Sequence, residues 1–78
     1  MIKKQLKLII TFSTTTEAMA MEQLCKEQGL DGRLIPVPKS ITAGCGLAWC
    51  AKLESRKLLM DQMRIFGVKA EGIYECMI

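Results

Sequence analysis

The residue best suited to chemistry is Cys45, which stands between Gly44 and Gly46 near the end of a loop. Glycines on both sides remove side-chain bulk around the sulfur and allow backbone angles that other residues avoid. Another protein's thiol or persulfide can approach such a sulfur closely. Lys39 lies in the same loop, where an ammonium group can stabilise a thiolate. The residues leave two interpretations open, a functional thiol or a Gly-Cys-Gly turn whose cysteine only fills space.

The absence of histidine restricts what this thiol can do. The 78 residues contain no His, so a Cys-His or Ser-His nucleophile pair cannot form within the chain. The sequence has no Walker loop and no G-x-G-x-x-G run, and its eight carboxylates form no recognisable pair. Conventional hydrolysis and phosphoryl transfer therefore have no candidate residues, and no cofactor is expected.

The other three cysteines, Cys25, Cys50 and Cys76, do not suggest a metal site or a disulfide framework. The only close pair is Cys45 and Cys50, whose spacing without histidine does not fit structural zinc, so no metal is expected. Cys25 and Cys76 are expected to pack as small apolar side chains. In an extended segment Cys50 lies about 16 Å from Cys45, beyond disulfide reach, and its role stays open.

Composition places the chain among small globular proteins. Half of its residues are hydrophobic and 24% are charged, which indicates one folded domain over residues 1–78. The net charge is +3, but no basic run is interleaved with aromatic residues, so no nucleic-acid partner is expected. Lys7 interrupts the N-terminal apolar run, so we expect no signal peptide, no membrane partner and a cytoplasmic location with reduced thiols.

The first half of the chain predicts a strand, a helix and a second strand. Leu6–Phe12 alternates apolar and polar residues, as in a strand with one buried face. Thr14, with Glu17 three residues later, fits a capping box that begins a helix, and Gly29 ends this helix. Arg33–Val37 reads as a short edge strand that prolines terminate.

The second half predicts a strand, a helix and a last strand after a loop over Pro38–Gly46. Leu47–Leu53 reads as a strand whose Trp49 faces the helices. Ser55 is the expected cap of the second helix, Gly67 ends it, and Gly72–Ile78 forms the last strand. The predicted buried stripe of this helix comprises Leu58, Leu59, Met63 and Phe66.

The order β-α-β-β-α-β predicts an α+β, ferredoxin-like sandwich, in which a four-stranded antiparallel sheet carries both helices on one face. Right-handed crossovers place the first and third strands at the centre. We expect the other face of the sheet to be solvated or to form a homodimer contact. This open face carries Lys7, Ile9, Thr11, Ala48, Cys50 and Lys52.

Two runs give the chain a family resemblance. RLIPVPK at 33–39, followed by CGLA at 45–48, resembles the selenium/sulfur (Se/S) carrier-like family. TFST at 11–14 and EGIYE at 71–75 are also similar, so the resemblance extends from about Leu6 to Glu75. It implies a cytoplasmic ferredoxin-like domain whose loop cysteine, Cys45, carries sulfur or selenium.

The resemblance implies that Cys45 accepts a chalcogen from a donor protein as a persulfide or selenosulfide and delivers it to an acceptor protein. This role belongs to a carrier or sulfur-transfer accessory protein rather than to a classical enzyme. The alternative is a non-catalytic small-molecule or regulatory binding module of the same fold, with the hydroxyl-rich turn at Ser13–Thr16 as its anion site.

Overall fold

The structure, a computed structural model, describes residues 5–41 and 44–78. The other residues, in the N-terminal run and in the middle of the predicted loop, lie outside the described part. The elements in chain order are β1 (Leu6–Thr11), α1 (Thr15–Gln28), β2 (Arg33–Pro36), β3 (Leu47–Lys52), a short 3-10 helix η1 (Leu53–Ser55), α2 (Arg56–Phe66) and β4 (Gly72–Met77).

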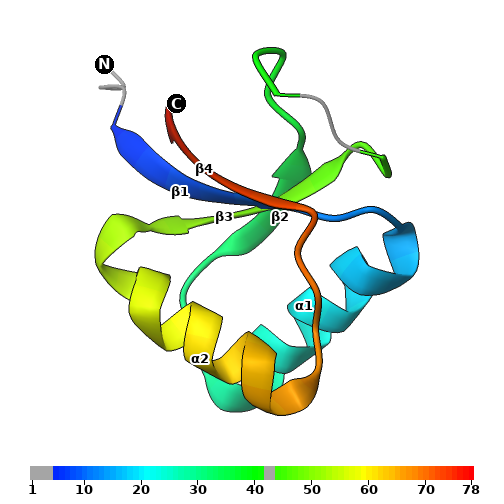
Figure 1. The fold of residues 1–78 in the computed structure, drawn as a ribbon. Coiled ribbons are helices and arrows are strands. Elements are labelled where there is room, and N and C mark those ends of the chain that lie inside the picture. The colour runs from blue at the N-terminus through cyan, green and yellow to red at the C-terminus, as the bar shows by residue number, and fades with distance from the viewer. Residues whose placement is uncertain (1–4, 42–43) are drawn as a thin grey trace.

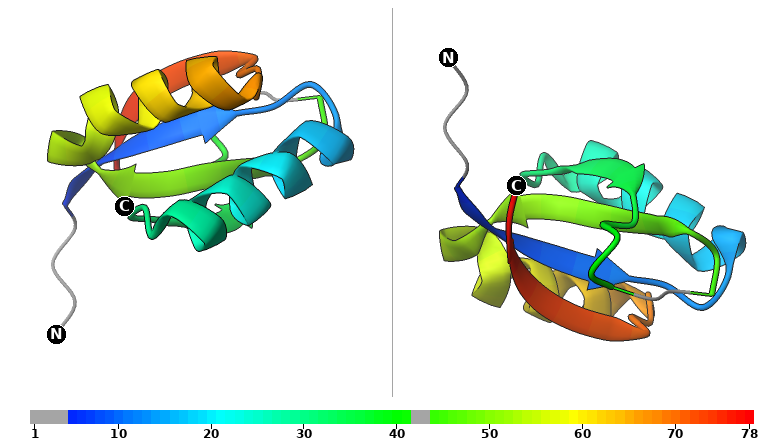
Figure 2. Two further views of the ribbon diagram at one scale, coloured as in Figure 1. Left: turned by 90° about the horizontal axis from the view of Figure 1, so that it is seen from below. Right: turned by 90° about the horizontal axis from the view of Figure 1, so that it is seen from above.

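The strands form one antiparallel sheet in the order β2-β3-β1-β4 (Figure 1). Ile10 of β1 lies opposite Trp49 of β3 on one side and Ile73 of β4 on the other. Both helices cover the same face of the sheet, as the two views in Figure 2 show. The predicted ferredoxin-like α+β fold is thus confirmed, including the central positions of the first and third strands.

The helix ends follow the sequence signals in part. Thr14 caps α1, because its Oγ1 accepts a hydrogen bond from the Glu17 N–H at 3.2 Å. The Glu17 carboxylate does not complete the box but accepts from the Lys69 N–H at 3.2 Å. Ser55 occupies the N-cap position of α2 as predicted, but its side chain makes no cap hydrogen bond, and η1 leads directly into the helix. Within the described residues, no helix is long and apolar enough to cross a bilayer.

The main core lies between the sheet and the helices, with Trp49 inside it as predicted. Two of the four α2 residues that were predicted to be buried are buried in the structure. Leu59 and Met63, one turn apart, are buried, whereas Leu58 and Phe66 are 52% and 53% exposed. Leu58 is rotated by about 100° from Leu59 around the helix, and the orientation that turns Leu59 to the sheet leaves Leu58 at the exposed side. Phe66 is the last residue of α2.

The open face of the sheet is not bare. Ile9, Thr11 and Ala48 on this face are fully buried, contrary to the prediction of one buried face for the first strand. Ile9 and Ala48 belong to a second, smaller cluster of buried residues. Val37 and Ile41, in the loop between β2 and β3, pack against this cluster. Figure 2 (right) shows this loop crossing the face opposite the helices. The loop, rather than solvent, therefore covers the middle of the open face.

Candidate functional site

Cys45 lies in the loop that connects β2 to β3, two residues before β3 begins. Its side chain is half-buried and packs against the main core. The thiol donates a hydrogen bond to the Leu47 carbonyl oxygen, with the sulfur 3.5 Å from that oxygen. Gly44 and Gly46 on either side are exposed. The sulfur is therefore held against the core from one side, while its chain neighbours add no side chains around it.

The two glycines meet different structural needs. Gly46 has φ +76°, in the left-handed region, and a Cβ built on it meets nothing within 4 Å. Its carbonyl oxygen accepts from the Val37 N–H at 3.0 Å, which continues the β2–β3 pairing beyond the strands. Gly44 instead provides space, because a Cβ there would lie 2.7 Å from the Ser13 carbonyl oxygen. Glycine is therefore required at position 46 by the backbone conformation, and at position 44 by close packing.

Glu71 fastens the Cys45 loop to the rest of the fold. One carboxylate oxygen accepts from the Gly44 N–H at 3.2 Å, and the other accepts from the Ser13 hydroxyl at 3.5 Å. The Glu71 N–H donates to the Thr11 carbonyl oxygen at 2.7 Å. Glu71 therefore links the residue before the thiol to the end of β1. Sequence reasoning assigned no site role to Glu71, although the closing EGIYE run contained it.

Lys39 lies in the same loop but has an exposed side chain. It follows Pro38, whose carbonyl oxygen accepts from the Ile41 N–H at 2.9 Å and so closes a turn. No hydrogen bond or ion pair in the described part of the chain joins Lys39 to Cys45. A role for Lys39 in stabilising the thiolate stays a prediction.

The other cysteines have different surroundings. Cys25 is buried in the main core as expected, and this burial raises the pKa of its thiol to about 11. Cys50 is 8% exposed, and burial raises its pKa although the nearby Lys7 and Arg33 oppose the shift. Cys76 is half-buried beside the second cluster. All four thiols are free, and only Cys45 lies in a loop with glycines beside it.

The predicted anion site at Ser13–Thr16 is partly engaged in the fold. Ser13 donates to Glu71, and the Thr14 side chain caps α1, so two of the four hydroxyls in the turn at Ser13–Thr16 already have partners within the fold. In residues 5–41 and 44–78, no three acidic or cysteine side chains gather as a metal-binding group would require.

Fold and site together define a small ferredoxin-like domain that holds one loop thiol between two glycines. The family model described as "Putative Se/S carrier protein-like" matches residues 7–75, and the chain belongs to this family. The matched range contains the Cys45 loop and its anchor Glu71. No curated protein and no solved structure matches the chain.

Proposed function

We propose that this protein is a sulfur or selenium carrier that holds the transferred atom on Cys45. The observation that supports it most is the half-buried thiol between two exposed glycines, in a loop that Glu71 anchors. Membership in the Se/S carrier-like family points to the same role. We place its donor and acceptor, which are proteins, with it in the cytoplasm, where thiols are kept reduced.

The transfer needs no base within the chain. The Cys45 thiolate attacks the terminal sulfur of a donor persulfide, R–S–SH, and a new sulfur–sulfur bond forms as the donor bond breaks. The donor leaves as a thiolate and takes up one proton, so Cys45 becomes a persulfide without net oxidation. Delivery is the same exchange in reverse, with the acceptor thiolate attacking the outer sulfur. A selenosulfide donor transfers selenium by the same bond changes.

Half-burial of Cys45 suits a carrier. A thiol that packs against the core presents its inner sulfur to attack from fewer directions than a fully exposed one. The outer atom, once bound, lies about 2 Å beyond the inner sulfur, farther along the side chain from the Cys45 backbone. Because attack at the outer atom delivers the chalcogen and attack at the inner atom does not, this shielding favours delivery.

Sulfur loading tests the proposal. The protein is mixed with glutathione persulfide, and the gain of one sulfur atom is followed by intact mass spectrometry. We expect Cys45→Ser to load at least about tenfold more slowly than wild type. Cys76→Ser is the matched control, since Cys76 is also half-buried but lies in β4. Equal loading of wild type and Cys45→Ser would rule out the assignment to Cys45.

We also propose a homodimer through the open face, with a smaller contact area than the sequence suggested. Val37 and Ile41 pack over the middle of that face. A second copy would therefore have to contact the parts of the face on either side of this loop.

A further inference from the structure

Three cations meet at one end of the open face, around Cys50. Lys7 of β1 lies directly opposite Lys52 of β3, and Arg33 of β2 lies directly opposite Cys50. Residues opposite each other in an antiparallel pair share a face, as do residues two apart along a strand. All three side chains therefore belong to the open face, where they line a pocket of about 310 Å³ together with Cys50 and the acidic Asp31.

The positive charge of this cluster is not neutralised by ion pairs. The salt bridges found in the described residues, Arg56–Glu75 and Arg64–Asp61, involve none of the three cations. Residues 1–4 and 42–43 contain no Asp or Glu, so they hold no acidic side chain for the cluster. Like charges directly opposite each other in a sheet destabilise it. The fold retains the Lys7–Lys52 pair despite this cost.

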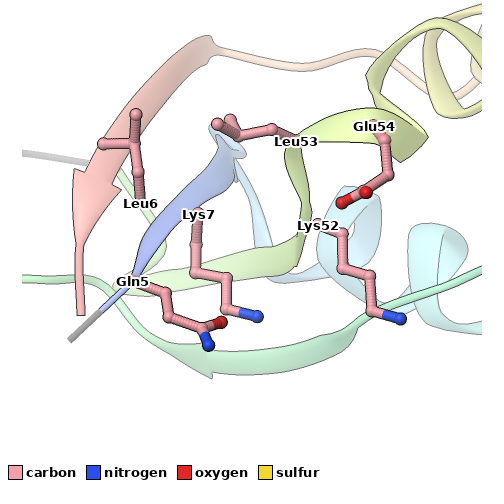
Figure 3. Close-up of a pocket in the computed structure, with 6 residues that line it drawn as sticks. All are labelled: Gln5, Leu6, Lys7, Lys52, Leu53 and Glu54. Atoms are coloured by element: carbon pink, nitrogen blue, oxygen red, sulfur yellow. The ribbon is translucent and has the colours of Figure 1, made fainter. Parts of the chain in front are cut away.

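Two carboxylates, Asp31 in the same pocket and Glu54 in the neighbouring one, stand against the three cations, and neither forms an ion pair with them in the described part of the chain. Asp31 is held by the backbone, because its Oδ2 accepts from the Lys52 N–H at 2.8 Å and its carbonyl oxygen accepts from the Trp49 indole at 3.0 Å. Glu54 lines a neighbouring pocket with Lys7 and Lys52. Figure 3 shows the ammonium groups of these two lysines directed to the same side of the sheet. An excess of positive charge therefore remains at this end of the face.

We propose that Lys7, Arg33 and Lys52 form a docking site for a carboxylate-rich segment of a partner protein. The proposal rests on the carrier function, since a carrier must be recognised by its donor or acceptor. Lys and Arg bind carboxylates through charge-assisted hydrogen bonds, and such complementarity steers association. The site lies beside the final residues of β3, at the opposite end of this strand from Cys45.

Two other occupants fit the surface less well. Single-stranded nucleic acid stacks on aromatic side chains, and neither pocket at this end is lined by one. A second copy of the chain in a symmetric contact centred on the cluster would bring the cluster against itself, with both chains at a net charge of +3.

The test measures binding of a fluorescein-labelled octaglutamate peptide by anisotropy at low salt. We expect Arg33→Gln/Lys52→Gln to weaken binding about tenfold or more. The matched control is Lys26→Gln/Lys57→Gln, which removes the same charge from exposed positions on the two helices and should change the Kd less than about twofold. If wild type does not bind the peptide, or if both double variants lose the same affinity for it, the proposed docking site is wrong. Tighter binding of a twelve-residue oligothymidylate, lost in the same variant, would overturn the choice of partner.

Two further measurements separate this proposal from the carrier function and from misfolding. Cys45→Ser should bind the peptide as wild type does, so failed sulfur loading with intact peptide binding would refute the carrier function alone. Lys52→Gln should raise the thermal midpoint by about 1–8 °C, because it removes the repulsion from Lys7. A lower thermal midpoint for Lys52→Gln would show that the Lys52 charge is compensated in the fold, and would contradict the argument for the docking site.

Discussion

Substitution of the glycines beside Cys45 should separate their two roles. At Gly46, alanine keeps φ +76° only with strain, which costs about 1–2 kcal/mol for a residue with a Cβ. Asparagine tolerates this region better, so Gly46→Asn should recover part of the loss. At Gly44, the alanine Cβ would lie 2.7 Å from the Ser13 carbonyl oxygen, and this overpacking should cost about 1–3 kcal/mol.

Thermal unfolding followed by circular dichroism measures both effects, since 1 kcal/mol shifts the midpoint by about 4–8 °C in a domain of this size. Ser13→Ala should not rescue Gly44→Ala, because the close contact is with the backbone of Ser13 and not with its side chain. A wild-type midpoint for Gly44→Ala would refute the packing argument. Equal losses for Gly46→Ala and Gly46→Asn would refute the backbone argument.

Three further predictions concern the scaffold. Leu59→Ala should cost about 2–5 kcal/mol in chemical denaturation because Leu59 is fully buried, whereas Leu58→Ala, at a 52% exposed residue, should cost under about 0.5 kcal/mol; similar losses would contradict the observed stripe. Thr14→Ala should lower stability by about 1 kcal/mol through loss of the cap, and an unchanged midpoint would count against the cap. Because burial raises the pKa of Cys25 from 9.0 to about 11, the unfolded chain loses this proton first, and stability should fall as the pH rises from 9 to 11. Denaturant titrations across that range should show a shallower fall in Cys25→Ala, and the same slope in both proteins would contradict the assignment.

Much of the fold could be predicted because its signals are local. Alternation over Leu6–Phe12 and the glycines that end both helices depend on neighbouring residues only. Gly29 and Gly67 indeed have positive φ at the helix ends. The buried positions of α2 were harder, because adjacent Leu58 and Leu59 are equivalent in composition and only the docking angle of the helix decides between them.

The features that could not be predicted from the sequence depend on contacts between residues far apart in the chain. Glu71 bonds to Gly44, 27 residues earlier in the chain, and no spacing rule relates the two. Likewise, Val37 was predicted as the end of an edge strand and Ile41 as part of a loop, so their packing over the open face could not be read from the pattern. Cys45 could be singled out as the candidate thiol from the sequence, because its glycine neighbours and its place in a loop are local features.

Delivery of sulfur from Cys45 tests the central claim most directly. Wild-type protein loaded with one sulfur is mixed with N-acetylcysteine, and both products are identified by mass spectrometry over time. A carrier yields N-acetylcysteine persulfide and a free Cys45 thiol, because the acceptor attacks the outer sulfur. A mixed disulfide between Cys45 and N-acetylcysteine, with sulfide released, would show attack at the inner sulfur and would contradict the carrier account.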